Sequence, residues 1–299
     1  MPDSDGRPTR TDDRPPPTHN GDTMPETNTE FSETETIFRM LSSVPEPQRT
    51  ILGASAVRIG GGVVAAMADD PTDYWSKALG FGFGSPVDDA LVGQIVDRYR
   101  SVGVRSATIQ IAPQKLPADW HAIAARHGLR AGGSWVRLEG PVDVAETPTR
   151  GLRVGPVPRA ELAEWARVVF VGFGMPPEDL APMMLAAVAA DDAHAFAAWD
   201  GDELVAGACL MVFGEVAHLA GAATLPGHRG RGAQSALIAA RAAAAKEAGA
   251  ERLFAETGKP ESPGDNSSLT NMERAGMRVL YERVNWKWTD TDAHPGLTG

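Results

Sequence analysis

The chain has 299 residues, of which 42% are hydrophobic and 22% charged, and its formal net charge at pH 7 is -11. This balance is ordinary for a globular protein and leaves room for one large domain or two modest ones. The acidic balance argues against a general nucleic-acid binder or a binder of anionic membranes, because either function needs a basic face.

Cys209 is the one cysteine of the sequence, which excludes an intrachain disulfide framework and the paired-cysteine metal motifs. We interpret it as a small buried hydrophobic residue. His, Asp and Glu residues show no metal-ligand spacing, so no metal site is predicted. The sequence contains no run of about 18 apolar residues, so no membrane span is predicted. The first residues are polar and lack the apolar centre of a secretory signal, which predicts a cytoplasmic protein.

Composition changes along the chain predict five segments. Residues 1–35 contain three Arg against nine Asp and Glu, with a proline run, and we expect a disordered acidic tail there. Residues 36–142 are predicted as a first folded unit. Residues 143–151 hold Pro, Thr and Gly and are typical of a linker. Residues 152–289 form the second predicted unit, and 290–299 a short flexible tail.

The first unit alternates strand and helix patterns. Asp88 to Val102 has apolar residues at helical spacing, with an aspartate able to cap its start and Gly103 able to end it. In chain order we predict a strand pair over 57–68 broken by glycines, an apolar Gly-rich stretch over 74–83, a helix over 88–102, a strand over 106–112, a helix over 117–127 and a strand over 134–138.

The second unit continues with the same kinds of pattern. Asp200-Gly201-Asp202 between two apolar runs is a hairpin signal. We predict strands over 152–157, 193–199, 204–213, 216–225, 252–256 and 279–288, and helices over 161–170, 178–190, 233–248 and 269–274.

Both units end in the same order of elements: strand, Gly-rich turn, helix, short strand, helix, glycine, strand. The sequence identity between them is low, so we interpret the pattern as a hypothesis of a duplicated fold; the alternative is that any α/β domain can produce it. Gly80, Gly82 and Gly84 stand at the turn of the first unit without an arginine pair. This predicts a structural turn there, and hence a degenerate first copy.

The segment from Thr224 to Leu237 carries the most specific signal. It contains Arg229-Gly230-Arg231-Gly232 between a predicted strand and a predicted Ala-rich helix. Closely spaced glycines let a turn expose its N–H groups at a helix N-terminus, where the helix dipole also favours an anion. The segment predicts a pyrophosphate-binding turn; the alternative is a plain strand-to-helix turn with solvated arginines.

This segment resembles the acyl-CoA loop of the GCN5-related N-acetyltransferase (GNAT) superfamily. Pro226, Arg229, Gly230 and Gly232 match its pattern, whereas Gln234 stands where Gly or Ala is usual. The resemblance covers residues 151–288 in element order and implies a central sheet that splays after its fourth strand. It further implies that backbone groups of Ala223, Thr224 and Leu225 pair with the pantetheine arm, and that the amides of Arg229, Gly230, Arg231, Gly232, Ala233 and Gln234 hold the pyrophosphate.

A second stretch, Asp265 to Met277, resembles the family's other signature, in which an Asn precedes a short helix that ends in Gly. The resemblance implies that Asn266 or Asn271 touches the acyl-CoA; the alternative for both is helix capping. Many members carry a Tyr on this helix as the general acid, but Met272 occupies that place here. Ser267, Ser268 or a water could substitute, since a thiolate is a weak base.

Acyl transfer to an amine needs a group that takes a proton and a donor for the carbonyl oxygen. The sequence offers Glu215, His218 and Glu256 as bases. Glu256 is favoured because it lies where the splayed strands implied by the resemblance would open, and His218 is second. The alternatives are a solvated carboxylate and a hydrogen-bonded histidine.

Together these features predict an α/β fold: a GNAT-like mixed, splayed sheet flanked by helices, with a second, degenerate GNAT-like half. The expected activity is transfer of an acetyl group from acetyl-CoA to a primary amine, of a small molecule or of a peptide, in a ternary complex. The alternative is a non-catalytic acyl-CoA sensor or an interaction protein. No nucleic-acid or membrane partner is expected, and apolar segments near Trp286 and Trp288, taken as edge strands, suggest a homodimer.

Overall fold

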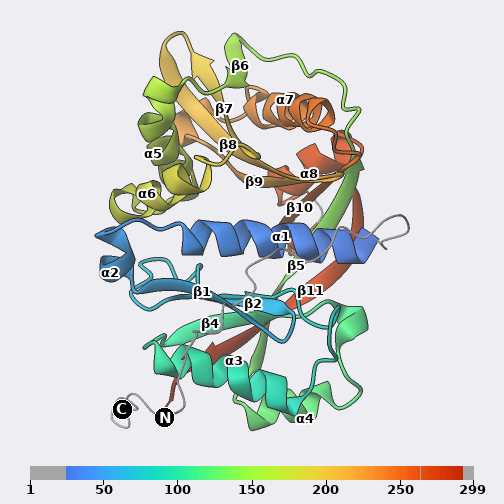
Figure 1. Cartoon of the computed structure of the whole chain (residues 1–299). Helices are drawn as coiled ribbons and strands as arrows, with labels where there is room; N and C mark the ends of the chain where they lie inside the picture. The colour runs from blue at the N-terminus through green and yellow to red at the C-terminus, as the bar shows by residue number, and fades with distance from the viewer. Residues whose placement is uncertain (1–24, 263, 292–299) are drawn as a thin grey trace, which may run out of the picture.

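A computed structural model describes residues 25–262 and 264–291. Within these residues the strands form one sheet of eleven, in the order β1-β2-β3-β4-β11-β5-β10-β9-β8-β7-β6 (Figure 1). The strands are β1 (Ala54–Ile59), β2 (Gly62–Met67), β3 (Lys77–Leu79), β4 (Ser106–Gln110), β5 (Arg130–Pro141), β6 (Leu152–Pro156), β7 (Ala193–Asp200), β8 (Glu203–Phe213), β9 (Val216–Thr224), β10 (Arg252–Gly258) and β11 (Arg278–Thr289).

The α-helices cover both faces of this sheet. They are α1 (Pro25–Ser42), α2 (Gln48–Leu52), α3 (Asp89–Ser101), α4 (Trp120–Arg126), α5 (Leu162–Phe173), α6 (Pro177–Ala187), α7 (Ala233–Glu247) and α8 (Ser267–Arg274). Helices α3 and α4 cover one core, and α7 and α8 cover a second. The third core contains α1, α2, α5 and α6 and therefore joins the two halves. None of these helices is long and apolar enough to cross a membrane.

Local sequence explains where the predicted elements begin and end. Asp88 caps α3 by accepting a hydrogen bond from the Leu91 N–H at 2.8 Å, as its short carboxylate favours. Gly60 and Gly61 adopt φ values of 55° and 84° and close the β1–β2 hairpin, a conformation that strains other residues. The alanines of α7 lie against the sheet in the second core.

Two corresponding sets of elements support the duplicated fold. In the first half β3 pairs in parallel with β4 and α3 connects them; in the second half β9 pairs in parallel with β10 and α7 connects them. Helices α4 and α8 then lead into the long strands β5 and β11. The turn after β3 packs tightly, since a Cβ on Gly82 would lie 2.6 Å from the Lys115 Cβ. This fits a structural turn rather than a phosphate site.

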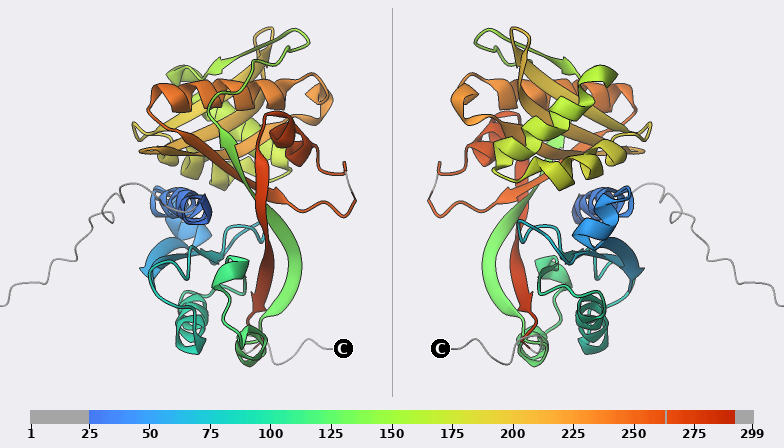
Figure 2. Two further views of the ribbon diagram at one scale, coloured as in Figure 1. Left: turned by 90° about the vertical axis from the view of Figure 1, so that its right-hand side faces the viewer. Right: turned by 90° about the vertical axis from the view of Figure 1, so that its left-hand side faces the viewer.

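The last strand of each half crosses into the other half. Strand β5 pairs with β10, where Glu139 faces Phe254, and β11 pairs with β4, where Trp286 faces Ile109. The two long strands also pair with each other, and Figure 2 shows them side by side, bridging the two parts. No helix or strand lies within residues 143–151.

Two sequence predictions are wrong. Residues 25–35 are not disordered but begin α1, which lies between the two halves (Figures 1 and 2). Composition gave the wrong prediction because polar residues of α1, Glu30 and Glu33 among them, are buried against arginines on β5 and β11. Residues 1–24 and 292–299 lie outside the described part of the chain. Trp286 and Trp288 are buried on β11, between β4 and β5, so they form no apolar edge and give no support to a homodimer.

Candidate functional site

The sheet opens between β9 and β10, as the resemblance described above implies. These strands pair only from Val216 to His218 and from Arg252 to Phe254. Beyond that point β9 continues to Thr224 along β8, and β10 continues to Gly258 along β5. Within the described residues, β9 therefore has no strand partner on the β10 side after His218. Its main-chain groups there can bind an extended ligand, apart from the carbonyl oxygens of Ala220 and Thr224, which accept from Arg241 and Arg229.

A β-bulge interrupts β9 in this open stretch. The register of β8 and β9 shifts between the Gly207–Ala223 pair and the Cys209–Ala220 pair, and Gly221 adopts a φ of 52°. A bulge bends its strand and re-aims its backbone groups. Here it lies where the strand borders the opening.

The turn between β9 and α7 has the geometry of an anion site. Gly230 and Gly232 adopt φ values of 73° and 86°, and Gly232 is the N-cap of α7. A Cβ on Gly232 would lie 2.9 Å from the Pro148 carbonyl oxygen. Glycine is therefore needed for conformation and for space, and the first amides of α7 remain open for an anion.

The two arginines of the turn mainly fix its shape. The Arg229 guanidinium donates to the carbonyl oxygens of Thr224 and Gly172, each at 3.2 Å. Arg231 pairs with Asp200 and donates to the Arg150 carbonyl oxygen at 2.9 Å. Both side chains still border the cavity described below, so they add positive charge beside the turn without being free.

A polar link joins α7 to α8 at the other side of the turn. Gln234 Nε2 donates to Ser268 Oγ at 2.7 Å, and Asn271 Nδ2 donates to Gln234 Oε1 at 2.8 Å. Asn266 instead caps α8, accepting from the Leu269 N–H at 3.1 Å. Its Nδ2 donates to the Gly258 carbonyl oxygen at 2.6 Å.

One cavity of about 950 Å³ connects the turn with the opening of the sheet. Predicted site residues that line it are Ala223, Thr224, Arg229, Gly230, Arg231, Gly232, Ala233, Gln234, Asn271, His218 and Glu256. Asn266 and Leu225 are not among its lining residues, and the Leu225 N–H is used by the Val205 carbonyl oxygen at 2.9 Å. Glu215 is exposed in the turn that precedes β9.

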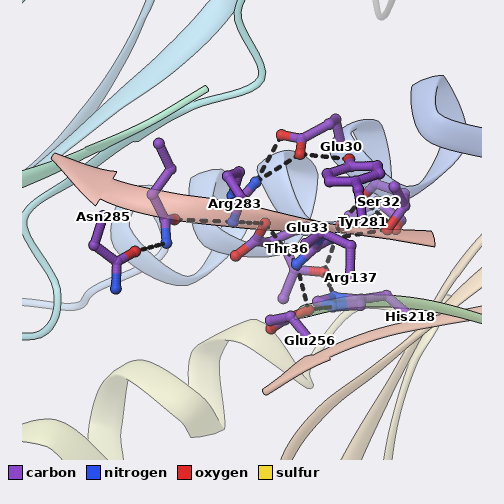
Figure 3. A network of polar contacts seen from close by, with 12 residues as sticks. Glu30, Ser32, Glu33, Thr36, Arg137, His218, Glu256, Tyr281, Arg283 and Asn285 are labelled. Carbon is purple, nitrogen blue, oxygen red and sulfur yellow. Dashed lines mark hydrogen bonds and ion pairs between the residues drawn. The ribbon is translucent and has the colours of Figure 1, made fainter. Parts of the chain in front are cut away.

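The two favoured catalytic candidates contact each other at the floor of this cavity. His218 Nε2 lies 2.6 Å from Glu256 Oε2, and His218 Nδ1 lies 2.7 Å from Thr36 Oγ1 on α1 (Figure 3). His218 is almost fully buried, whereas part of the Glu256 side chain is accessible. Both ring nitrogens of His218 are thus occupied, and Glu256 is the member of the pair whose side chain is accessible from the cavity.

Glu256 is held as an anion by its surroundings. Its Oε2 also accepts from Arg137 Nη1 at 3.0 Å, while Oε1 has no partner within residues 25–262 and 264–291. Burial alone raises the pKa of Glu256, but the nearby His218 and Arg137 lower it by more, so the carboxyl pKa lies well below its ordinary range. The free oxygen is therefore a carboxylate acceptor open to the cavity.

Behind Glu256 a buried ionic network runs along α1 (Figure 3). Glu33 accepts from Arg137 at 2.8 Å and from Arg283 at 2.7 Å, and Arg283 also pairs with Glu30 at 2.7 Å. Both guanidinium groups are 0% exposed. The network ties β5, β11 and α1 to the site, and it gives α1 a fixed position beside Glu256.

Sequence reasoning missed this network and an aromatic wall of the same cavity. Tyr74, Trp75 and Trp135, all from the first half, line the cavity together with Phe170. A signal for α1 is present in Ile37, Met40 and Leu41, which have the spacing of one apolar helix face, and Glu30 and Glu33 precede them in the same segment. No local pattern could indicate that their partners are arginines on β5 and β11.

Comparisons with known proteins agree with this geometry. Residues 159–264 match the model of the acetyltransferase (GNAT) family. A GCN5-related N-acetyltransferase from Kribbella flavida has a TM-score of 0.55 and 21% identity, covering 87% of this chain and 96% of its own. A GCN5-related N-acetyltransferase from Sphaerobacter thermophilus has a TM-score of 0.56 and 15% identity, covering 89% and 94%.

A tandem GNAT protein from the clavulanic acid biosynthesis pathway has a TM-score of 0.54 and 14% identity, covering 91% of this chain and 97% of its own. No curated protein matches the chain in sequence. The resemblance to the tandem protein spans both halves, in line with the two corresponding sets of elements described above. Residues 159–264 therefore form a domain of the acetyltransferase (GNAT) family, within a chain whose whole fold is that of GNAT proteins with two GNAT-like halves.

Proposed function

We propose that the protein transfers an acetyl group from acetyl-CoA to a primary amine, directly between the two bound substrates. The observation that carries the proposal is one cavity that holds both an anion-binding turn and an open carboxylate. Most of the rate gain of such a reaction can come from holding the reactants together, and this cavity has a place for each.

The residues present fit the donor. The amides from Gly230 to Gln234, in the turn and at the start of α7, would hold the pyrophosphate, in a turn whose shape depends on glycine at 232, where a Cβ would collide with the Pro148 carbonyl oxygen. The unpaired edge of β9 at Ala223 and Thr224 would pair with the pantetheine arm. Asn271 would add a side-chain contact near the same arm. Acetyl-CoA supplies the activated thioester.

The acceptor would lie at the Glu256 end of the cavity. The free Oε1 of Glu256 can receive an ammonium N–H and orient the amine toward the donor. Because its pKa is low, Glu256 keeps a proton only briefly and would pass it to water in the cavity. His218 holds the Glu256 carboxylate in place and shares in the proton transfer. The aromatic wall of Tyr74, Trp75 and Trp135 favours an amine with an apolar body.

A second function is favoured by Met272. This residue lines the cavity where related enzymes often carry a tyrosine, and α8 contains no tyrosine. A protein that binds acyl-CoA but does not react it would retain the anion-binding turn and lack the tyrosine that acts as general acid. Turnover on a panel of amines separates the two functions.

Titration calorimetry with acetyl-CoA, followed by a thiol-release assay on amines, tests the proposal. Gly232→Asp should abolish binding, because its Cβ would collide with the Pro148 carbonyl oxygen and distort the turn, and its carboxylate would add negative charge beside the amides. Gly227→Asp is the matched control, since Gly227 lies in the same turn with open space around it and does not line the cavity. Glu256→Gln should keep acetyl-CoA affinity but lower the rate about 10²-fold or more.

Acetyl-CoA binding by the native protein without thiol release on any amine would favour the sensor. Absence of binding to the native protein would overturn the acyltransferase proposal. Equal loss in Gly227→Asp and Gly232→Asp would show that binding responds to added negative charge in general and not to the shape of the turn at Gly232.

A further inference from the structure

Arg241 on α7 is a buried cation without a counter-ion. Its residue is 2% exposed. Nε donates to the Leu237 carbonyl oxygen at 3.1 Å, and Nη1 donates to the carbonyl oxygens of Cys209 at 3.0 Å and Ala220 at 3.3 Å. No carboxylate of the described residues forms an ion pair with it. Fully buried arginines without a paired anion are rare, because desolvation of the charge is costly.

The remaining nitrogen of this side chain faces the cavity. Nη2 donates to no protein atom in the described part of the chain, yet it is not among the buried unsatisfied atoms, and Arg241 lines the cavity. Burial lowers the pKa of Arg241 to about 10, so the group remains cationic at neutral pH. Two N–H donors on a charged group are therefore available to whatever occupies the cavity.

The position of Arg241 along β9 indicates which ligand atom it meets. The anion-binding turn follows Thr224, and His218 and Glu256 lie at the other end of the opening. Arg241 contacts β9 at Ala220, between these two ends and beside the bulge. Along α7 it lies about 13 Å from Gly232, at a rise of roughly 1.5 Å per residue. If the proposed function holds, the reacting carbonyl lies between the pantetheine segment and Glu256, which is this stretch.

We propose that Arg241 is a catalytic residue whose Nη2 donates to the thioester carbonyl oxygen of the acyl donor. This inference rests on the proposed function. The amine lone pair forms the new C–N bond while the carbonyl π pair moves onto the oxygen beside Arg241. That pair returns as the C–S bond breaks, the sulfur leaves with its bonding pair as a thiolate, and the proton from nitrogen passes toward Glu256 and water.

This role explains why the buried Arg241 guanidinium has no carboxylate as an ion-pair partner among the described residues. The negative charge it would stabilise exists only during the reaction, and a preorganised donor in a dry site is most effective against such a charge. It also offsets the absence of a tyrosine on α8, because charge stabilisation at the carbonyl lowers the barrier before the thiolate leaves. The carbonyl groups of Cys209 and Ala220 fix the guanidinium plane, so the direction of Nη2 is set in advance.

Two probes separate this contact from a structural role: acetyl-CoA and S-ethyl-CoA, a thioether that lacks the carbonyl oxygen. The native protein should prefer acetyl-CoA, and Arg241→Met should reduce that preference about tenfold, as expected for one charge-assisted hydrogen bond. The affinity for S-ethyl-CoA should stay unchanged. The preference of Arg241→Lys for acetyl-CoA should lie between those of the native protein and Arg241→Met, because lysine keeps the charge. Acyl transfer should fall about 10²- to 10³-fold in Arg241→Met.

Arg252→Met is the control, because Arg252 is exposed on β10 and pairs with Glu139 away from the cavity. If the Arg241 variants bind both probes more weakly by the same factor, Arg241 only supports the bulge, and the inference is overturned. Equal affinity of the native protein for the two probes would overturn it even if no Arg241 variant folds. Absence of binding of either probe to the native protein would instead refute the proposed function.

Discussion

At the scale of residues, the contact between His218 Nε2 and Glu256 Oε2 fixes the carboxylate that borders the cavity. His218 and Glu256 are separate candidates in the sequence, because His218 lies on the predicted fourth strand of the second unit and Glu256 at the end of the predicted fifth. Their contact at 2.6 Å depends on β9 and β10 being parallel neighbours, which local patterns do not encode. Asn266 illustrates the opposite case: capping and ligand binding need the same residue type, and the structure has it as a cap.

Lys77 is a buried residue whose effect should appear in the pH dependence of stability. It is 4% exposed, and its Nζ lies 3.3 Å from the centre of the Tyr74 ring and 5.0 Å from that of Trp135. No ion pair within the described residues includes it. Burial lowers its pKa from 10.5 to about 8, although Glu33 and Glu256 act in the opposite direction.

We expect this pKa to make the native protein more stable relative to Lys77→Met as the pH rises from 8 to about 10.5. In that window the unfolded chain binds the Lys77 proton and the folded protein does not, so the free energy of unfolding increases with pH. Below pH 8 both states are protonated and the full cost of burial remains. The difference between the two proteins should change by about 3 kcal/mol. Urea denaturation at several pH values measures it, and a difference independent of pH would contradict the assigned pKa.

At the scale of elements, periodicity predicts most of the structure, and the failure at α1 has a physical cause. Strands that are apolar along nearly their whole length, such as β8, and helices with one apolar face, such as α3, lie where their patterns indicate. Helix α1 buries Thr29, Glu30, Ser32 and Glu33, which a scale based on hydrophobicity assigns to solvent. Strand β3 is only three residues long, too short for a pattern.

Glu33 should therefore contribute far more to stability than its neighbour Glu35 on the same helix. Glu33→Ala removes a carboxylate shared by Arg137 and Arg283, which are both fully buried, and leaves two charges under-compensated. We expect a loss of about 3–5 kcal/mol. Glu35 pairs with the partly exposed Arg58, so Glu35→Ala should cost about 1 kcal/mol or less. Chemical denaturation of both variants measures this, and similar losses would show that α1 is not held by the ionic network.

At the scale of the whole molecule, the exchange of β5 and β11 joins the halves more closely than a linker would. The order of elements predicts two copies of a fold, because each half repeats strand, helix, strand, helix, strand. It does not predict that each copy lends its last strand to the other, since strand order is decided by contacts between residues far apart in sequence. The cavity reflects the exchange, because its aromatic wall comes from one half and its anion-binding turn from the other.

This exchange predicts that the two halves cannot act alone but can reassemble. A protease site placed within residues 143–151, where the chain has no regular structure, should give two fragments that stay together under native conditions.

Residues 152–291 alone lack β5, so β10 loses its partner on that side, the Arg137 contact to Glu256 is lost, and α1 is absent. We expect this fragment to aggregate or to bind acetyl-CoA at least about tenfold more weakly than the intact chain. Its binding should return when it is coexpressed with residues 25–142. Size-exclusion chromatography and titration calorimetry measure both effects, and native affinity in the isolated fragment would show that the shared sheet is not needed for the site.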